Sequence, residues 1–307
     1  MSTFFNFYPN TLYLHSSSNP NVINSLIAKG IYALDQYVRQ DIYDGCIRNE
    51  RDYVSTLMSY TRLFFRNVKV VKNFYHCQSQ ILSNNLEQEF GCDALILFRS
   101  AGNTAKLCLF EAKYPRLNQI NYRWDEYQTK NRYSHFHDQL TRQNNWSSSA
   151  FIWELFINDN LPGHSIKGFD KYGSTCVWHE DAYKYSETNL THPCNGYYNQ
   201  LWNKNKLKEC VEQLPYNPLN LEDILTAILR SSVKEKLIPI KEEMIKIKSS
   251  EGKTIDIPAS VNMIREIQNN FFETTGISNF LFIEFEDILS EIITETGKDI
   301  NIDEIEF

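Results

Sequence analysis

The sequence contains no apolar run long enough to cross a bilayer, since runs such as residues 150–157 are short and interrupted by Glu154. Its start, MSTFFNFYPNTLYLH, lacks the basic residues and the long apolar centre of a signal peptide. Both absences predict a soluble, cytoplasmic protein without a membrane partner. Export by a route that needs no N-terminal signal stays open.

The chain also lacks a disulfide framework. Its seven cysteines are an odd number and are scattered along the sequence. Cys92 and Cys108 stand in apolar runs, where Cys behaves as a small hydrophobic residue. This usage is typical of a reducing compartment. A cysteine-dependent hydrolase using Cys46 or Cys176 is an alternative function, but no recognisable nucleophile motif supports it.

Internal repeats and low-complexity linkers are absent too, whereas material for a core is plentiful. Of the 307 residues 42% are hydrophobic, including 19 Phe and 18 Tyr, which suits one large domain or two ordinary ones. Residues 1–215 carry 22 Lys and Arg against 20 Asp and Glu, whereas residues 216–307 carry 9 against 18. Because two prolines in PYNPLN coincide with this shift, we expect one domain over 1–215 and an acidic domain or subdomain over 216–307.

Basic residues of the first part gather in two stretches, 48–72 and 113–142. Each holds six Lys and Arg against two or three acidic residues. Such clusters favour a polyanion partner such as nucleic acid. Solvated helix faces would give the same composition and remain the alternative.

Apolar spacing and turn residues give a coarse order of elements. Helices are predicted over 22–37 and, after an N-cap at Asn49, over 50–67. Further along we expect one or two strands around 68–71 and 78–82, a hairpin of 94–98 with 107–110, a helix over about 125–146 and a buried strand over 148–157. This order predicts an α/β fold with a mixed central sheet flanked by helices.

The chain after that strand is less regular. Residues 160–200 have the composition of loops. The acidic part predicts a helix over 221–237, a hairpin turning at 250–252, and helices over 259–272 and 286–296 on either side of the apolar run NFLFIEF. We expect an α+β segment in which no residue looks catalytic.

The stretch GCDALILFRSAGNTAKLCLFEAKYP, residues 91–115, holds the candidate chemistry. If its turn centres on Gly102, residues whose numbers add up to 204 lie opposite each other, so that Asp93 faces Glu111 across the hairpin. Glu111 and Lys113 then share one face of their strand. The other face is apolar throughout, which predicts a central strand pair buried on both sides.

Two carboxylates opposed across a strand pair repel each other, and burial strengthens the repulsion. They could share a proton, pair with Lys113 or hold a divalent cation. Two acids and a backbone carbonyl suit Mg²⁺, which keeps several waters, and a lysine beside the metal can stabilise or help deprotonate an attacking water. Alternatively, the strand ends leave the core and the acids are ordinary solvated charges.

Asp93, followed by Glu111-Ala112-Lys113 at the end of the apolar strand LCLFEAK, resembles the motif of the PD-(D/E)XK nuclease superfamily. The flanking elements are similar as well, because a helix precedes the sheet and a helix and a strand follow the lysine. The resemblance covers about residues 48–158. It implies a restriction-endonuclease-like core of αβββαβ order within a nuclease-like domain over 1–215.

The resemblance also implies a metal-dependent phosphodiesterase. Asp93 and Glu111 would ligate Mg²⁺, or Mn²⁺, with help from the carbonyl of Ala112. Lys113 would position or activate the attacking water.

Many members of the superfamily add a glutamate from the helix before the sheet, for which Glu50 is the candidate. Many also place a glutamine of the following helix near the site. Gln139 and Gln143 both qualify, being one helical turn apart on the same face. Two departures stand out: no proline precedes Asp93, and no tyrosine follows either glutamine at the spacing of the branch with a Gln-x-x-x-Tyr signature.

A second group of metal-ligand residue types lies in the loop-like region. Cys176, His179, His192 and Cys194 supply two thiols and two imidazoles within nineteen residues. The Cys-x₂-His spacing is a plausible half-site for tetrahedral zinc, whereas His-x-Cys is tight for one. A loop with unrelated Cys and His residues is the alternative.

These observations together predict a Mg²⁺-dependent nuclease that acts on nucleic acid, with DNA and endonuclease action following the family's general habit. A catalytically inactive nuclease-like module that binds nucleic acid or a protein is the alternative. The acidic segment could serve dimerisation, partner binding or steric protection of the site. A homodimer is compatible with the sequence but does not follow from it.

Overall fold

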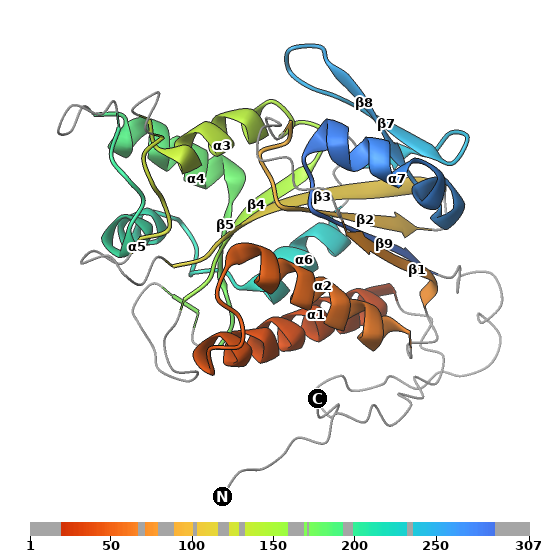
Figure 1. Ribbon diagram of the computed structural model, residues 1–307, viewed down its shortest axis with the longest axis horizontal. Coiled ribbons are helices and arrows are strands. Elements are labelled where there is room, and N and C mark those ends of the chain that lie inside the picture. The colour runs from red at the N-terminus through yellow and green to blue at the C-terminus, as the bar shows by residue number, and fades with distance from the viewer. Residues whose placement is uncertain are drawn as a thin grey trace, which may run out of the picture.

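A central mixed sheet of seven strands organises the molecule (Figure 1). The computed structural model describes residues 20–66, 71–78, 89–100, 103–115, 123–128, 133–158, 169–170, 172–192, 199–231 and 236–285. Neighbouring strands follow the order β1-β9-β2-β3-β4-β5, and the short strand β6 pairs with β3. A separate two-stranded sheet is formed by β7 and β8. The α/β class and the helix-flanked mixed sheet are therefore confirmed.

The elements of the first part are α1 (Pro20–Tyr43), α2 (Glu50–Phe65), β1 (Val71–Gln78), β2 (Ala94–Ser100), β3 (Thr104–Lys113), α3 (His135–Asn144), β4 (Phe151–Phe156), β5 (Thr175–Trp178), α4 (His179–Tyr185), a π-helical turn (Ser186–Leu190) and α5 (Lys204–Glu212). Those of the second part are α6 (Leu221–Arg230), β6 (Ile238–Pro239), β7 (Met244–Lys248), β8 (Thr254–Pro258), α7 (Val261–Thr275) and β9 (Asn279–Phe285). The run from α2 to β4 has the expected αβββαβ order.

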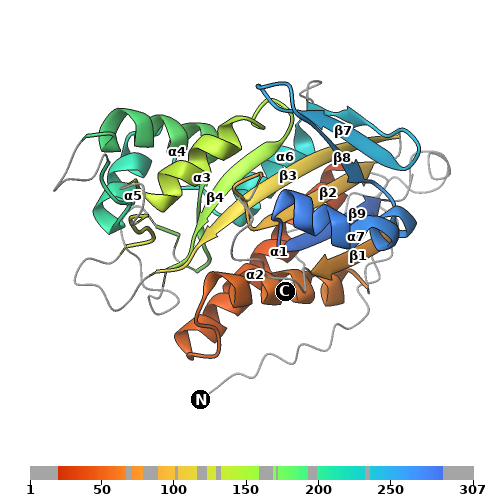
Figure 2. The ribbon, with the colours of Figure 1, turned by 45° about the horizontal axis from the view of Figure 1, so that its top comes forward.

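Helices and a hairpin cover the sheet on both faces. Helices α1, α2 and α6 pack on one face, where alternate residues of β2 and β4 enter their core. The other face carries two cores, one under α7 and the β7–β8 hairpin and one among α3, α4 and α5 (Figure 2). Because successive strand residues point to opposite faces, β2 and β3 are buried on both sides.

The register of the hairpin agrees with the sequence prediction. Leu95 pairs with Leu109 and Leu97 pairs with Leu107, so that paired residue numbers add up to 204. The turn uses Asn103 with a positive φ of 52°, a conformation that Asn tolerates better than most residues. β9 pairs with β2 on the other side, and β4 pairs with β3. The hairpin is therefore the centre of the sheet.

Strand β9 enters the sheet between β1 and β2, pairing antiparallel with β1 and parallel with β2. It comes from the acidic part of the chain that we expected to form its own domain or subdomain over 216–307. Helix α6 of the same part packs against α1. The boundary near residue 215 remains a prediction, but residues on both sides of it build one sheet.

Several element positions differ from the sequence prediction. Strand β1 covers Val71–Gln78, whereas the stretches expected as strands, 68–71 and 78–82, lie almost entirely outside the described residues. Helix α3 begins at His135 rather than near Asp125, since buried Asp125 instead accepts hydrogen bonds from the Ser134 hydroxyl and the Phe136 amide. Helix α6 is shorter than expected, and the helix predicted over 286–296 lies outside the described residues.

Residues 160–200, expected to be loops, contain regular structure where the chain is described. Strand β5 pairs with β4, and α4 and the π-helical turn follow it directly. The strand is only four residues long, which gives too little pattern for a sequence prediction.

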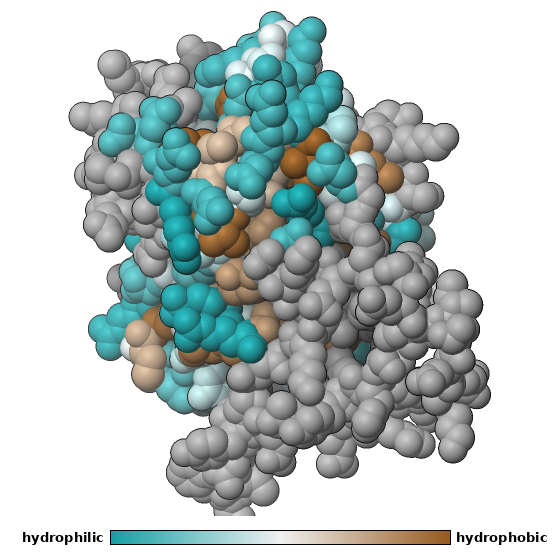
Figure 3. All heavy atoms as spheres, turned by 90° about the vertical axis from the view of Figure 1, so that its right-hand side faces the viewer, coloured by the Kyte–Doolittle hydropathy of each residue, from teal (hydrophilic) through white to brown (hydrophobic). Residues whose placement is uncertain are grey.

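Two surface properties complete the fold. None of the helices in the described ranges combines the length and the apolar character that a bilayer span requires. In the coloured part of the face seen in Figure 3, hydrophobic residues lie among hydrophilic ones.

We predict that a chain ending at residue 215 does not fold cooperatively. It would lack β9, which leaves β1 and β2 without a shared neighbour, and it would lack α6, which covers the core beside α1. The test is urea unfolding of the truncated chain and of the full chain, monitored by near-ultraviolet circular dichroism. A sigmoidal transition and a near-ultraviolet spectrum like those of the full chain would contradict the prediction.

Candidate metal centre

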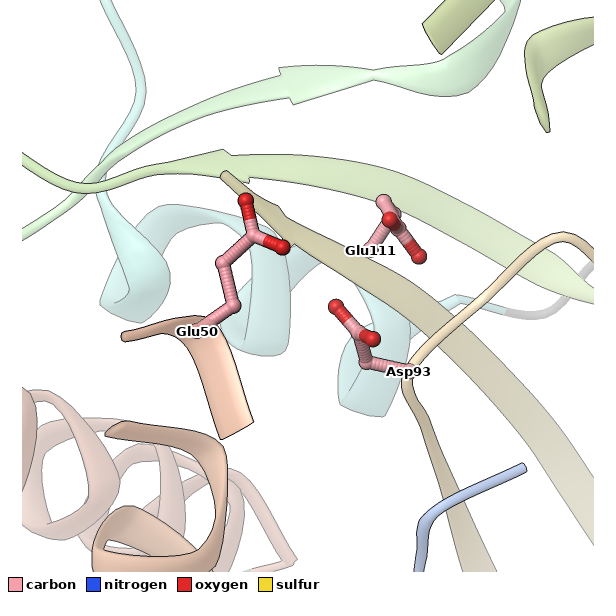
Figure 4. Close-up of side chains that lie close together, drawn as sticks. All are labelled: Glu50, Asp93 and Glu111. Atoms are coloured by element: carbon pink, nitrogen blue, oxygen red, sulfur yellow. The ribbon is translucent and has the colours of Figure 1, made fainter. Parts of the chain in front are cut away.

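Three carboxylates converge beside the open end of the central hairpin (Figure 4). Glu50 is the first residue of α2, Asp93 directly precedes β2, and Glu111 lies near the end of β3. Each offers an oxygen, and these oxygens all lie within 4.8 Å of one another. Within the described ranges, these three residues are the one group of His, Cys, Asp or Glu side chains close enough to share a metal ion.

The start of α2 positions Glu50. The side chain of Asn49 caps the helix by accepting a hydrogen bond of 2.9 Å from the amide of Asp52, as predicted. The carboxylate of Glu50 in turn accepts a hydrogen bond of 2.9 Å from the amide of Tyr114, directly after β3. Glu50 is thus tied to the end of the strand that carries Glu111.

Asp93 is held by the continuation of the hairpin. Its amide donates to the carbonyl of Phe110 at 3.0 Å, and its Oδ2 accepts from the amide of Ala112 at 2.9 Å. Its own carbonyl accepts from the amide and the hydroxyl of Ser278, just before β9. These backbone contacts keep the carboxylate beside Glu111.

Glu111, Lys113 and Gln139 form a closed, buried triangle. Lys113 Nζ donates to Glu111 Oε1 at 2.6 Å and to Gln139 Oε1 at 2.8 Å, while Gln139 Nε2 donates to Glu111 Oε1 at 2.5 Å. The lysine ammonium also lies 4.8 Å from the centre of the Phe136 ring. All three members of the triangle are almost fully buried. By contrast, Glu50 and Asp93 are partly exposed and form the rim.

The local charges fix the protonation of Lys113. Burial alone would lower its pKa, but the carboxylates of Glu111, Glu50 and Asp93 together raise the pKa of Lys113 above its ordinary value. At neutral pH this side chain is therefore an ammonium ion. It can orient or stabilise a negative group but has no free lone pair with which to accept a proton.

Burial and mutual repulsion disfavour the charged forms of the carboxylates. Burial, followed by the charge of Glu50, raises the pKa of Asp93 to about 7, and burial together with Asp93 raises the pKa of Glu111 well above its usual range. A divalent cation would relieve this repulsion.

The residues present fit a hard divalent metal. Glu111 Oε2 is buried and makes no hydrogen bond, although its partner oxygen Oε1 accepts two. A free oxygen of a buried carboxylate needs a ligand of its own. With Asp93 and Glu50 it makes an all-oxygen donor set, which suits Mg²⁺ or Mn²⁺. The carbonyl of Ala112, expected to assist, stays a predicted ligand.

The two glutamines expected near the site have different partners. Gln139 belongs to the buried triangle, whereas Gln143 Nε2 donates to the carbonyl of Gly91 at 2.7 Å and lies 3.4 Å from Glu154 Oε2. Glu154 itself was not predicted. The one signal for it is the acid that interrupts an apolar strand, and its position beside Glu111 follows from the pairing of β3 with β4.

The zinc site predicted at Cys176, His179, His192 and Cys194 stays a prediction, because Cys194 lies outside the described residues. Cys176 belongs to the core under α1 and α6, and burial raises the pKa of its thiol well above the ordinary value. His179 is buried and places Nδ1 3.2 Å from Glu154 Oε1. His192 is exposed.

Comparison of the chain with family models, with curated proteins and with solved structures gives no match. The geometry of the site is therefore the basis on which a function can be proposed.

We predict that Mn²⁺ or Mg²⁺ raises the melting temperature more at pH 8 than at pH 6. Below the pKa of Asp93, about 7, a proton competes with the metal for the carboxylate. Metal at a hundredfold excess over Kd contributes about 2.7 kcal/mol, which raises Tm by roughly 5 °C. Thermal scans with each metal and with a chelator measure the effect. Equal shifts at both pH values, or an undiminished shift in Asp93→Asn, would contradict it.

We also predict that Asp93→Asn stabilises the metal-free protein at pH 8. Because the folded-state pKa of Asp93 is about 7, above about 3.9 in an unfolded chain, its contribution is fully favourable below pH 4 and is lost as the pH rises towards 7. A rise in pKa from about 3.9 to about 7 corresponds to about 4 kcal/mol. Because the Asp93 carboxylate is partly exposed and screened by solvent, removing the charge should raise the free energy of unfolding at pH 8 by roughly 1–2 kcal/mol. Urea unfolding in chelator measures it, with exposed Asp256→Asn as the control. A gain in the control, or none in Asp93→Asn, would count against the electrostatic account.

Proposed function

We propose that the protein is a Mg²⁺-dependent nuclease that hydrolyses phosphodiester bonds, with duplex DNA as substrate and internal cleavage as its mode of action. The observation that carries the proposal is the arrangement of Glu50, Asp93 and Glu111 around one point, with the ammonium of Lys113 on Glu111. The order α2-β1-β2-β3-α3-β4 around these residues supports the resemblance to the PD-(D/E)XK superfamily.

Each side chain has a role that follows from its position. When bound, the cation would acidify a water molecule and neutralise charge on the phosphate. Asp93 and Glu50, on the partly exposed rim, would hold the cation where a substrate can reach it. Glu111 would ligate from the buried side through Oε2, the oxygen that makes no hydrogen bond.

Lys113 acts as a fixed positive charge in this proposal. Its ammonium is held by Glu111 and Gln139, and in the metal-free protein the surrounding carboxylates raise its pKa. It would orient the attacking water by hydrogen bonding and stabilise negative charge that develops on the phosphate. Removal of the water's proton then falls to another acceptor, such as solvent or a substrate phosphate oxygen.

A positively charged side chain, that of Arg51, lies near the rim where it could contact the substrate. Arg51 is exposed, follows Glu50 on α2, and its charge lowers the pKa of Asp93 in opposition to burial and Glu50. A positive charge this close to the rim suits a phosphate of the nucleic acid backbone. The preference for DNA over RNA rests on the family resemblance alone.

We predict Mg²⁺- or Mn²⁺-dependent cleavage that Asp93→Asn and Lys113→Met each reduce at least a hundredfold. Loss of a metal ligand or of the transition-state charge removes about 3 kcal/mol or more of stabilisation. Supercoiled plasmid, linear duplex and single-stranded RNA are digested with Mg²⁺, Mn²⁺, Ca²⁺ or chelator, and the products are resolved on gels.

Asp256→Asn and Lys246→Met serve as matched controls, because these residues form an exposed ion pair on the β7–β8 hairpin. Both should cleave like the unchanged protein. Activity that survives in a folded Asp93→Asn or Lys113→Met variant would refute the proposed mechanism. Nucleic acid binding without cleavage under every metal condition would instead favour an inactive nuclease-like module.

A further inference from the structure

A second row of polar side chains lies beside the metal centre. Gln143 on α3 donates to the carbonyl of Gly91 at 2.7 Å, and the same Nε2 lies 3.4 Å from Glu154 Oε2. The other oxygen of Glu154 lies 3.2 Å from Nδ1 of His179, the first residue of α4. Gln143, Glu154 and His179 form what we call the polar chain. Its members are 0%, 0% and 1% exposed.

The polar chain runs parallel to the buried part of the metal centre. Glu111 and Glu154 are register partners on the adjacent parallel strands β3 and β4, and therefore project from the same face of the sheet. Helix α3 packs over these two glutamates, and its residues Gln139 and Gln143 are one turn apart. Gln139 contacts Glu111, and Gln143 contacts Glu154. Two glutamine–glutamate pairs thus stand side by side. Only the Gln139–Glu111 pair includes a member of the group that could hold a metal ion.

The polar chain ends on the turn that carries Asp93. Gly91 lies two residues before Asp93 and has a positive φ of 62°. A side chain there would place its Cβ 2.7 Å from the carbonyl oxygen of Gln139, so that only glycine allows the turn to pack this closely on α3. The hydrogen bond from Gln143 then fixes the carbonyl of Gly91 against the same helix.

Glu154 and His179 determine which end of the Gln143 amide faces the turn. A carboxylate only accepts hydrogen bonds when ionised, so Glu154 requires the NH₂ end of Gln143 on its side. The same NH₂ group is the one that reaches Gly91, whereas Gln143 Oε1 makes no hydrogen bond. The tautomer of His179 with its hydrogen on Nδ1 would donate to Glu154 across the 3.2 Å contact, and His179 Nε2 is likewise buried without a hydrogen bond.

We infer that Gln143, Glu154 and His179 are positioning residues that hold the Gly91–Asp93 turn and thereby place the Asp93 carboxylate for metal binding. None of the three belongs to the group of carboxylates that could hold the ion. Burying a carboxylate, an amide and an imidazole together in a core costs free energy. The hydrogen bonds of these three groups lead to the turn before Asp93, so the function that would explain this cost is to hold a metal ligand in place. The inference rests on the metal centre of the proposed function and not on nuclease activity.

The test measures Mn²⁺ affinity by calorimetry at 20 °C, together with the electron paramagnetic resonance spectrum of the bound ion. Gln143→Met removes both amide groups at similar size, and Glu154→Leu removes the acceptor in the middle of the polar chain. Both should raise the Kd for Mn²⁺ roughly tenfold to a hundredfold, the usual effect of losing a partner that orients a metal ligand. The spectrum should change with them.

Glu154→Gln is the conservative variant. Its amide oxygen can accept from Gln143 while its NH₂ faces His179, which can change tautomer. Its Kd should therefore stay within about threefold of the unchanged protein if hydrogen bonding is what positions Asp93. Exposed Gln213→Met controls for the substitution type. Urea unfolding in chelator records the stability of every variant.

A merely structural role would lower the free energy of unfolding and leave the Kd of the folded protein unchanged, which would overturn the inference. It would also fall if Glu154→Gln binds Mn²⁺ as weakly as Glu154→Leu, or if the unchanged protein binds no Mn²⁺. Should Gln143→Met fail to fold, the comparison of Glu154→Leu with Glu154→Gln decides. Tight Mn²⁺ binding that depends on the polar chain, in a protein that cleaves no nucleic acid, would support the inference and refute only the nuclease.

Discussion

The candidate metal centre depends on one buried carboxylate, that of Glu111, near the end of the central strand β3. Burial and the nearby Asp93 raise its pKa well above the usual range, and one ammonium, Lys113, offsets part of the cost. One of its oxygens is saturated by Lys113 and Gln139, while the other makes no hydrogen bond. This incomplete pairing is what a metal ligand requires before its metal binds, because a carboxylate with both oxygens satisfied would have to break contacts first.

The surrounding fold is arranged so that this carboxylate cannot relax. Strands on both sides fix β3, and α3 closes the face above it with Gln139. Glu50 and Asp93 come from a helix start and a turn, and both are tied to the end of β3 by backbone amides. Elements distant in sequence thus hold negative charges together that would separate in an unfolded chain. Like charges held in this way destabilise the metal-free protein, and a bound cation removes that cost.

Features that depend on local sequence could be predicted, whereas those that depend on distant pairing could not. The alternation of apolar residues around the turn at Asn103 fixes the hairpin register, and Asn49 followed by an apolar stripe fixes the start of α2. The register predicts Asp93 opposite Glu111, whereas the approach of Glu50 to this pair is expected only from the family resemblance. Strand β9 lies between β1 and β2 and so pairs with residues about two hundred positions earlier in the chain. No local pattern encodes this pairing. The neighbourhood of Glu154 likewise appears only once β4 lies beside β3.

The buried half of the metal centre and its exposed rim are held in place by different interactions. This difference affects which metal ions the centre can distinguish. The buried half, Glu111 with Lys113 and Gln139, is set by sheet and helix packing and has little freedom. The rim carboxylates of Glu50 and Asp93 are partly exposed, and each accepts a hydrogen bond from a backbone amide at the end of β3. A cation that demands strict octahedral geometry therefore depends on how well the rim is held, whereas one that tolerates varied geometry does not. Because the contacts of Gln143, Glu154 and His179 lead to the Gly91–Asp93 turn, they act on the half of the centre that packing alone leaves adjustable.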